Sequence, residues 1–395
     1  MNFRSDRHVF FFVLLLFAVN KLLVMSAVVW ATKHLIDNLS VAGYLKYIII
    51  DNFYKWDSGW YGSIVEKGYT PKSSAFFPLY PMLIYAGHHL FSLSIPMAGA
   101  LISNLAFLAM LYFAYKLLRV DYEQKDARKI MWLLCLFPTS YYFSAVYTES
   151  LFLLLMAITL YCIRTQNWTG ALASGWFVSI TRNTGVFLTV PYALETFKIK
   201  TWGDLFSFLR GSKTHWIQIR WKPFFLVFLM PLPFFAYMGY LWFKFQDSFA
   251  FMHSQDQFGR GSLNPFVTIY KGYETNLAYL LKTDHIEWYG IYYFVEVFVV
   301  SLALLVLVGT IRKLRLSYWI IILYSVLIPL SAPANGQVID YFVSFIRYSL
   351  VIFPLFIGLY ELIKGKKPLY LLTLGIFAVL LLALTFHWSV DQWVA

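Results

Sequence analysis

Residues 52–81, NFYKWDSGWYGSIVEKGYTPKSSAFFPLYP, form the longest polar interruption in the first quarter of a very apolar chain. The stretch combines the carboxylate of Asp57 with Trp56 and Trp60, and Asp51 lies directly before it. Such a mixture is typical of the boundary between lipid headgroups and water. We therefore expect the apolar runs on either side to lie in a membrane and this stretch to lie at the membrane surface.

The composition of the whole chain agrees with this interpretation. Of its 395 residues, 60% are apolar and only 13% are charged, a balance typical of polytopic membrane proteins. The net charge of +12 indicates cytoplasmic loops rich in Lys and Arg that contact anionic membrane lipids. No basic aromatic module of a known nucleic-acid-binding type is found in the sequence, so we expect no nucleic-acid partner.

The length of the chain limits the number of spans. At about 20 residues per helix, with the long polar stretches set aside, we predict an all-α fold of about eleven transmembrane helices. The whole chain, 1–395, is expected to form a single integral membrane domain. The predicted spans are 9–30, 96–118, 130–147, 151–163, two short helices within 168–190, 223–243, 291–311, 318–330, 343–363 and 369–388.

The N-terminus sets the orientation of these spans. Arg4 and Arg7 precede the first apolar run, and no clear small-residue cleavage site follows it. These features predict an uncleaved signal anchor with a cytoplasmic N-terminus. Most Lys and Arg residues then fall on the cytoplasmic side, including a basic stretch at 195–222, as the positive-inside rule requires.

Two long polar segments fall outside the cytoplasm in this scheme. The first external loop, 32–95, is expected to contain helices that lie on the membrane surface. Its last part, 76–94, is apolar enough to span the membrane, but Pro78 and Pro81 favour an interfacial or re-entrant helix. The second long external loop covers 244–290.

Asp57 is the first candidate for chemistry. A carboxylate shielded by tryptophans in a partly dry pocket can act as a general base toward a hydroxyl group. The alternative is a carboxylate at headgroup level that only solvates a surface helix. Asp51 is the competing candidate base, and it lies on a different helical face.

Arg182 and Arg347 are ionisable residues within or at the edge of apolar segments. Such residues are costly in lipid, so they normally face an interior cavity and pair with another group. The partner is either a protein carboxylate such as Glu149 or a phosphate, which a guanidinium binds with two parallel hydrogen bonds. Arg182 begins the tetrapeptide 182–185, RNTG, which we place at the outer tip of a helical hairpin.

A further polar cluster lies in the second external loop. His253, Asp256 and Arg260 occur at intervals of about one helical turn in the segment FMHSQDQFGRGSLNPF. The adjacent residues His88 and His89 cannot share one metal ion from neighbouring helical positions. The sequence has no spacing that indicates a metal site, so we predict none.

These residues alone predict a membrane protein with a pocket for phosphate and carboxylate at its outer face. An enzyme that uses a lipid phosphate is the leading class, and a transporter or flippase of lipid-linked sugars is the alternative. The place where the polar groups converge distinguishes them. A transporter needs them near the membrane midplane, whereas an enzyme needs them near the outer interface, beneath the long loops. A scaffold protein without activity is a third class.

Several motifs in chain order resemble the family of glycosylphosphatidylinositol mannosyltransferase II, which has bacterial relatives. They spread from residue 56 to residue 356 and so cover most of the chain. The motifs are Trp56-Asp57, Gly68-Tyr69, AFFPLYP at 75–81, SAVYTESLF at 144–152, RNTG at 182–185, DSFAFMHSQ at 247–255, Arg347-Tyr348 and PLF at 354–356.

This resemblance implies a GT-C class glycosyltransferase in the bacterial cytoplasmic membrane. Its activity would transfer a sugar, usually mannose, from a polyprenyl-phosphate carrier to an acceptor hydroxyl outside the cytoplasm, with inversion at the anomeric carbon. The acceptor would be a glycan, a glycolipid or a protein of the cell envelope. The acidic residue that this class uses as the base maps onto Asp57.

The roles that we expect for the other residues follow from this scheme. The donor phosphate is bound by Arg182 and Arg347, with help from His253 or Arg260, and Glu149 orients Arg182 or an acceptor hydroxyl. Basic side chains can neutralise a leaving monophosphate, so no cofactor is required, although a divalent metal ion stays possible. The supporting residues are Trp56, Asp51, Glu149, Asn183, Asp256 and Tyr348.

Overall fold

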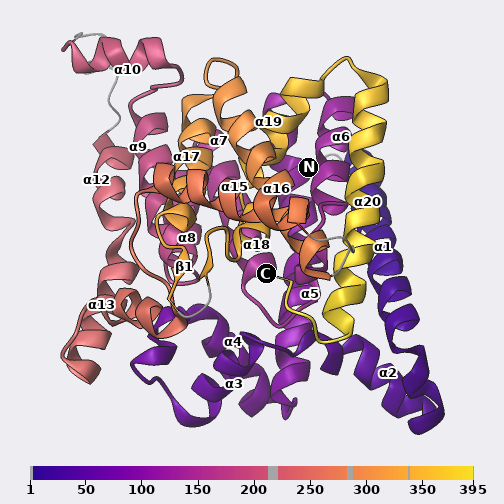
Figure 1. Ribbon diagram of the computed structural model, residues 1–395. Coiled ribbons are helices and arrows are strands. Elements are labelled where there is room, and N and C mark those ends of the chain that lie inside the picture. Colours follow the sequence, from indigo (N-terminus) through magenta and orange to yellow (C-terminus); the bar gives the residue numbers. More distant parts are fainter. Residues whose placement is uncertain (1–2, 212–220, 283–287, 337–338, 395) are drawn as a thin grey trace.

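The computed structural model describes residues 3–211, 221–282, 288–336 and 339–394 (Figure 1). In these ranges the chain is helical apart from its loops and one short hairpin of strands, β1 (Ala334–Asn335) and β2 (Ile339–Asp340). The prediction of an all-α protein is confirmed. The middle of the basic stretch predicted at 195–222 falls on 212–220, outside the described residues.

Long apolar helices make up most of the bundle. Within the described ranges, five helical segments are long and apolar enough to cross a membrane, and two shorter apolar helices accompany them. The chain is therefore an integral membrane protein. The five segments contain α1 (Phe3–Thr32), α5 (Ile95–Asp121), the pair α12 (Trp221–Leu229) and α13 (Leu232–Phe245), α16 (Trp288–Gly309) and α20 (Lys367–Ser389), and the shorter helices are α17 (Leu316–Leu330) and α19 (Phe353–Ile363).

The span predicted at 130–147 is not one continuous helix. Helix α6 (Gln124–Cys135) ends at Cys135, and the chain continues in turns that include the 3-10 segment η4 (Ser140–Phe143). Pro138 explains this end, because a proline lacks an N–H group and clashes with the preceding helical turn. The amide of Asn20 satisfies the freed carbonyl of Cys135 with a hydrogen bond of 2.9 Å.

The segment 168–190 is a helical hairpin, as predicted. After α7 (Glu149–Arg164), α8 (Trp168–Ser179) descends to a break, and η5 (Asn183–Leu188) and α9 (Thr189–Thr196) return beside it. The hydroxyl of Tyr192 reaches the carbonyl of Trp168 at 3.5 Å, and the two rings lie 5.3 Å apart. Arg182 lies at the break between the two arms.

The first polar loop forms surface helices at one end of the bundle, at the bottom of Figure 1. Helix α4 has 13 residues and is not among the membrane-crossing helices found in the described ranges, which agrees with the prediction for 76–94. This loop contains η1 (Lys33–Asn38), α2 (Val41–Ile49), η2 (Asp51–Phe53), α3 (Ser58–Lys67), η3 (Lys72–Ala75) and α4 (Leu79–Phe91).

The segment predicted as the second long loop contains more helix than a loop would. After α14 (Ala250–His253) and η6 (Ser254–Phe258), the 18-residue helix α15 (Pro265–Lys282) packs across α16 and α17. Two hydrogen bonds fix it to α16, from Asn276 to Glu296 at 2.9 Å and between Tyr273 and Ser301 at 2.6 Å. Residues 283–287 lie outside the described part of the chain.

The remaining helices complete both ends of the bundle. Helix α10 (Trp202–Leu209) lies at the top of Figure 1, at the end opposite to the surface helices. The span predicted at 343–363 is divided into α18 (Phe345–Leu350) and α19, with Pro354 in the first turn of α19. A proline is favourable there because its missing N–H would have no helical partner.

Candidate active site

A cavity of about 650 Å³ lies beneath both polar segments. Its walls come from α3 and η3 of the first segment, from 251–262 of the second, from the tip of the α8–α9 hairpin and from α18. Most of the predicted site residues line this cavity: Asp57, Glu149, Arg182, Asn183, His253, Asp256, Arg260, Arg347 and Tyr348. Residues from separate parts of the sequence therefore share one cavity.

Asp57 lies at the N-terminal end of α3 and forms an ion pair with Arg347. The distance from Nη1 of Arg347 to Oδ2 of Asp57 is 2.7 Å. The backbone N–H of Asp57 donates to the hydroxyl of Tyr147, and this hydroxyl donates to the carbonyl of Lys55. Within the described part of the chain no hydrogen bond reaches Oδ1 of Asp57, which leaves this oxygen available to a substrate.

The buried carboxylate of Glu149 lies between two guanidinium groups. Its Oε1 atom is 2.9 Å from Nη1 of Arg182 and 3.6 Å from Nε of Arg347, and the side chain is 1% exposed. The pairing of Arg182 with Glu149, which the sequence left open, is thus observed. Asp57, Arg347, Glu149 and Arg182 form a chain of alternating charges along one wall, which we call the charge chain.

Arg260 supplies a third guanidinium group, which forms no ion pair with a carboxylate in the described part of the chain. Its donors reach the carbonyl of Ala332, the hydroxyl of Ser344 and the hydroxyl of Tyr348, and no ion pair of Arg260 is found among the described residues. The guanidinium carbons of Arg182, Arg260 and Arg347 lie 5.2, 5.6 and 5.1 Å from the ring centre of Tyr348. Arg182, Arg260 and Arg347 therefore surround the ring of Tyr348 within one cavity, which also contains the carboxylate of Asp256.

Other predicted site residues lie less centrally. Nδ1 of His253 is 2.7 Å from Oδ2 of Asp247 at the cavity mouth, and this hydrogen bond lowers the pKa of the Asp247 carboxyl. Asn183 is the first residue of η5, and its side-chain oxygen accepts a hydrogen bond from the N–H of Thr184. Asp51 pairs with Lys46 at 3.2 Å and does not line the cavity.

Two residues that contribute to the cavity carried no role in the sequence analysis. Tyr147 holds the backbone of Asp57, and its place in the motif SAVYTESLF, two residues before Glu149, was the available signal. Trp393 lines the cavity from the far end of the chain, and its ring packs against Trp56 with centroids 5.2 Å apart. Nothing in the spacing of Trp393 connects it to the first loop.

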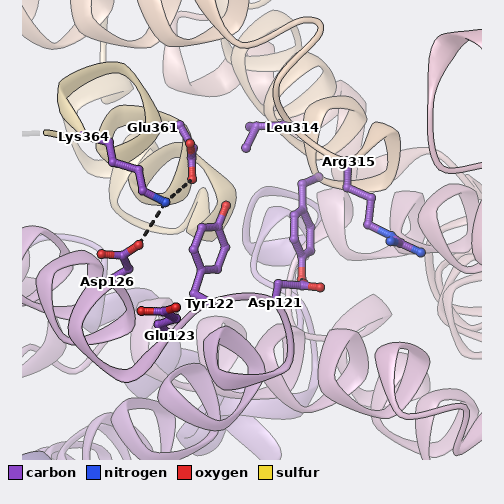
Figure 2. Close-up of a pocket in the computed structure, with 9 residues that line it drawn as sticks. Asp121, Tyr122, Glu123, Asp126, Leu314, Arg315, Glu361 and Lys364 are labelled. Carbon is purple, nitrogen blue, oxygen red and sulfur yellow. Dashed lines mark hydrogen bonds and ion pairs between the residues drawn. The ribbon is translucent and has the colours of Figure 1, made fainter.

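A second cavity, of about 620 Å³, is lined by residues at the ends of α5, α6, α17 and α19 (Figure 2). These helix ends lie opposite to the surface helices (Figure 1). Its charged side chains largely pair within the protein, with Lys364 at 2.9 Å from Asp126 and Arg315 bound by two hydrogen bonds to Glu195. Asp121 pairs with Arg164 and also accepts from Tyr318. These contacts join the ends of several helices, so we interpret this region as structural and call it the ion-pair cluster.

A family model described as mannosyltransferase (PIG-V) matches residues 5–257, which is more than half of the chain. The match includes Asp57, Glu149 and Arg182, whereas Arg260 and Arg347 lie beyond it. No curated protein matches the chain. Among the described residues, no group of three or more His, Cys, Asp or Glu side chains is placed to hold a metal ion.

Proposed function

Because this chain belongs to the mannosyltransferase (PIG-V) family, we propose that it transfers mannose from a polyprenyl-phosphate carrier to an acceptor hydroxyl group. Family membership makes it a membrane glycosyltransferase, and the donor, the stereochemistry and the side of the membrane are our proposal. The observation that carries it is the shared cavity, which brings the Asp57 carboxylate, with one available oxygen, together with the guanidinium groups of Arg182, Arg260 and Arg347.

The three arginines are suited to the donor phosphate. The hydrogen-bond partners of Arg260 in the described part of the chain are all neutral, so it can bind a phosphate oxygen without giving up a direct ion pair. Arg182 also lies near the ring of Tyr348, at 5.2 Å from its centre, and adds a second positive charge. His253 stands at the mouth of the same cavity. As the bond to the sugar breaks, these groups stabilise the negative charge that develops on the leaving phosphate.

Asp57 is the proposed base. Its Oδ1 atom takes the proton of the acceptor hydroxyl while the acceptor oxygen bonds to the anomeric carbon. The bond from this carbon to the phosphate oxygen breaks at the same time, and the polyprenyl phosphate leaves with the electron pair. Attack opposite the leaving group inverts the configuration. The bond from Arg347 to Oδ2 leads us to propose that Arg347 orients Asp57 as well as facing the phosphate.

The setting of the reaction is part of the same proposal. We place the cavity on the outer face of the bacterial cytoplasmic membrane, with a cytoplasmic N-terminus and a GT-C bundle of about eleven spans, counting the short helices. The acceptor is a glycan, glycolipid or protein. Guanidinium groups supply the charge that the phosphate needs, so the scheme requires no metal ion. The position of the cavity under both polar segments favours an enzyme over a transporter.

The substitution Asp57→Asn tests the proposal. The purified protein in lipid nanodiscs is incubated with labelled polyprenyl-phosphate mannose and a membrane extract, and the labelled product is quantified. Loss of a positioned base typically costs a hundred- to ten-thousand-fold in rate, and we expect a loss of about this size. Asp51→Asn is the matched control, because Asp51 lies in the same loop but outside the cavity. Normal transfer by a folded Asp57→Asn protein would refute the role of Asp57.

A further inference from the structure

The end of the chain is fixed against the loop that carries Asp57. The indole N–H of Trp388 donates to the carbonyl of Asn52 at 2.8 Å. The ammonium group of Lys55 donates to the carbonyls of Trp388 and Ser389 at 3.2 and 3.3 Å, and it forms an ion pair with Asp391 at 2.7 Å. Lys55 therefore binds carbonyls at the end of α20, and the segment 388–394 is held beside the active-site cavity.

This anchoring brings two tryptophans together beside the proposed base. The rings of Trp56 and Trp393 meet edge to face, with centroids 5.2 Å apart and an interplanar angle of 86°. They are 41% and 37% exposed, and Trp393 lines the cavity that contains Asp57. Trp56 precedes Asp57 directly and has a φ of 56°, a left-handed conformation that is unfavourable for a tryptophan. Strained backbone positions often occur at functional sites.

The chemistry of this pair differs from that of the arginine wall. An indole ring presents a broad apolar face with negative charge density, which suits the weakly positive C–H groups on one face of a pyranose ring. A sugar stacked in this way keeps its hydroxyl groups at its rim, where a neighbouring carboxylate can reach them. A phosphate gains nothing from such a surface, because it needs positive donors. The tryptophan pair is thus suited to an uncharged sugar.

We propose that Trp393, packed against Trp56, forms the acceptor subsite, and that it binds a pyranose ring of the acceptor with one hydroxyl directed at Asp57. This inference rests on the proposed function, which it deepens by naming a sugar as the acceptor group. The competing possibility is that both tryptophans only anchor the protein among lipid headgroups. Only a role in the acceptor subsite predicts that sugar binding depends on Trp393.

The first test measures binding without turnover. Saturation-transfer NMR with methyl α-D-mannopyranoside and methyl α-D-glucopyranoside is recorded on the full-length protein in nanodiscs. Trp393→Leu keeps an apolar side chain but lacks the aromatic face, so we expect it to fold and to bind the pyranoside about tenfold more weakly than the wild type does. Trp393→Phe restores most of the binding. Trp30→Ala is the matched control, because Trp30 is an exposed tryptophan that packs on Phe386 of α20 and does not line the cavity.

The second test separates this inference from the proposed function. In the transfer assay, Trp393→Leu should raise the KM for the sugar acceptor about tenfold and leave the KM for the polyprenyl-phosphate donor unchanged. Equal acceptor KM and equal pyranoside binding in wild type and Trp393→Leu would overturn the subsite while transfer itself stands. If no donor supports turnover but pyranoside binding still depends on Trp393, the sugar site stands and the proposed function fails. A wild-type protein that binds neither pyranoside also overturns the subsite.

Discussion

At the scale of single residues, the carboxylate of Glu149 decides how the charges of the cavity balance. It is almost completely buried, one oxygen faces Arg182 and Arg347, and the other oxygen has no hydrogen-bond partner among the described residues. Replacing one partner of a buried ion pair typically costs 3–5 kcal/mol, because the remaining charge stays buried without compensation. We expect Glu149→Gln to lower the stability by about this amount, as measured by thermal unfolding in nanodiscs.

A double variant checks whether the unpaired charge is the cause. Arg182→Met removes the charge that Glu149→Gln leaves unpaired, so the double variant should be more stable than Glu149→Gln alone. Its rate of mannosyl transfer should stay low, because the donor phosphate loses one guanidinium group. Strictly additive destabilisation by the two substitutions would show that the side chains are not coupled.

The sequence predicted the members of this site better than their contacts. Arg182 and Arg347 were expected to face a cavity because charge in an apolar segment needs a partner, and both line it. The pair of Arg347 with Asp57 joins residues 290 positions apart, and no local pattern encodes such a contact. Trp393 was not predicted as a site residue for the same reason, since only the packing of α20 against the first loop brings it to the cavity.

At the scale of elements, the helical hairpin that positions Arg182 depends on the close approach of its two arms. A side chain at Gly185 would overlap the backbone carbonyl of Val178, so only glycine allows η5 to pack against α8. We expect Gly185→Ala to push the arms apart, to cost about 1–3 kcal/mol of stability and to raise the KM for the donor by displacing Arg182. Thermal unfolding and transfer kinetics measure both effects.

Gly239→Ala is the matched control for this prediction. Gly239 lies within the helix α13, and an added methyl group there meets no other atom within 4 Å. The control should leave the donor KM unchanged and keep or slightly increase the stability, because alanine favours helices more than glycine does. A Gly185→Ala protein that matched the Gly239→Ala protein in both measurements would contradict the role of the hairpin.

The sequence pattern predicts some of the helices and misses others. Long apolar runs predicted α1, α5, α16 and α20 well, because soluble proteins rarely contain an apolar run as long as a membrane is thick. Helix α15 was not predicted within the segment 244–290, since its mixed polar and apolar residues resemble a loop until α16 and α17 are there to cover its apolar face. Helices that owe their stability to tertiary packing are hard to predict from sequence.

At the scale of the whole molecule, the two ends of the bundle have different tasks. One end holds the cavity with Asp57. The other end holds the ion-pair cluster, which joins the ends of α5, α6, α7, α9, α17 and α19. The ion pair of Lys364 with Asp126 belongs to this second end. Substitutions in the ion-pair cluster should therefore alter the stability of the protein and leave the kinetics of mannosyl transfer unchanged.

The shifted pKa values in the ion-pair cluster make the stability of the protein depend on pH. Burial raises the pKa of Asp126, but hydrogen bonds from Tyr360 and Lys364 outweigh it, so the pKa lies below the ordinary value of 3.8. The hydrogen bond to Asp126 raises the pKa of Lys364 above 10.5. The Asp126 contribution is present above its unfolded pKa and is lost as the pH falls through the folded value. The Lys364 contribution is present below its unfolded pKa and is lost as the pH rises through the folded value.

The variant Lys364→Met should therefore be less stable than the wild type between about pH 5 and pH 9, and the difference should shrink below about pH 4. Because Lys364 is 46% exposed, we expect a difference of only about 0.2–1 kcal/mol, as for other exposed ion pairs. Thermal unfolding across this pH range measures it. Lys125→Met, at an exposed lysine of α6 with no ion pair in the described part of the chain, should show no such pH dependence. A stability difference that is constant down to pH 3 would show that packing, and not the ion pair, links α6 to α19.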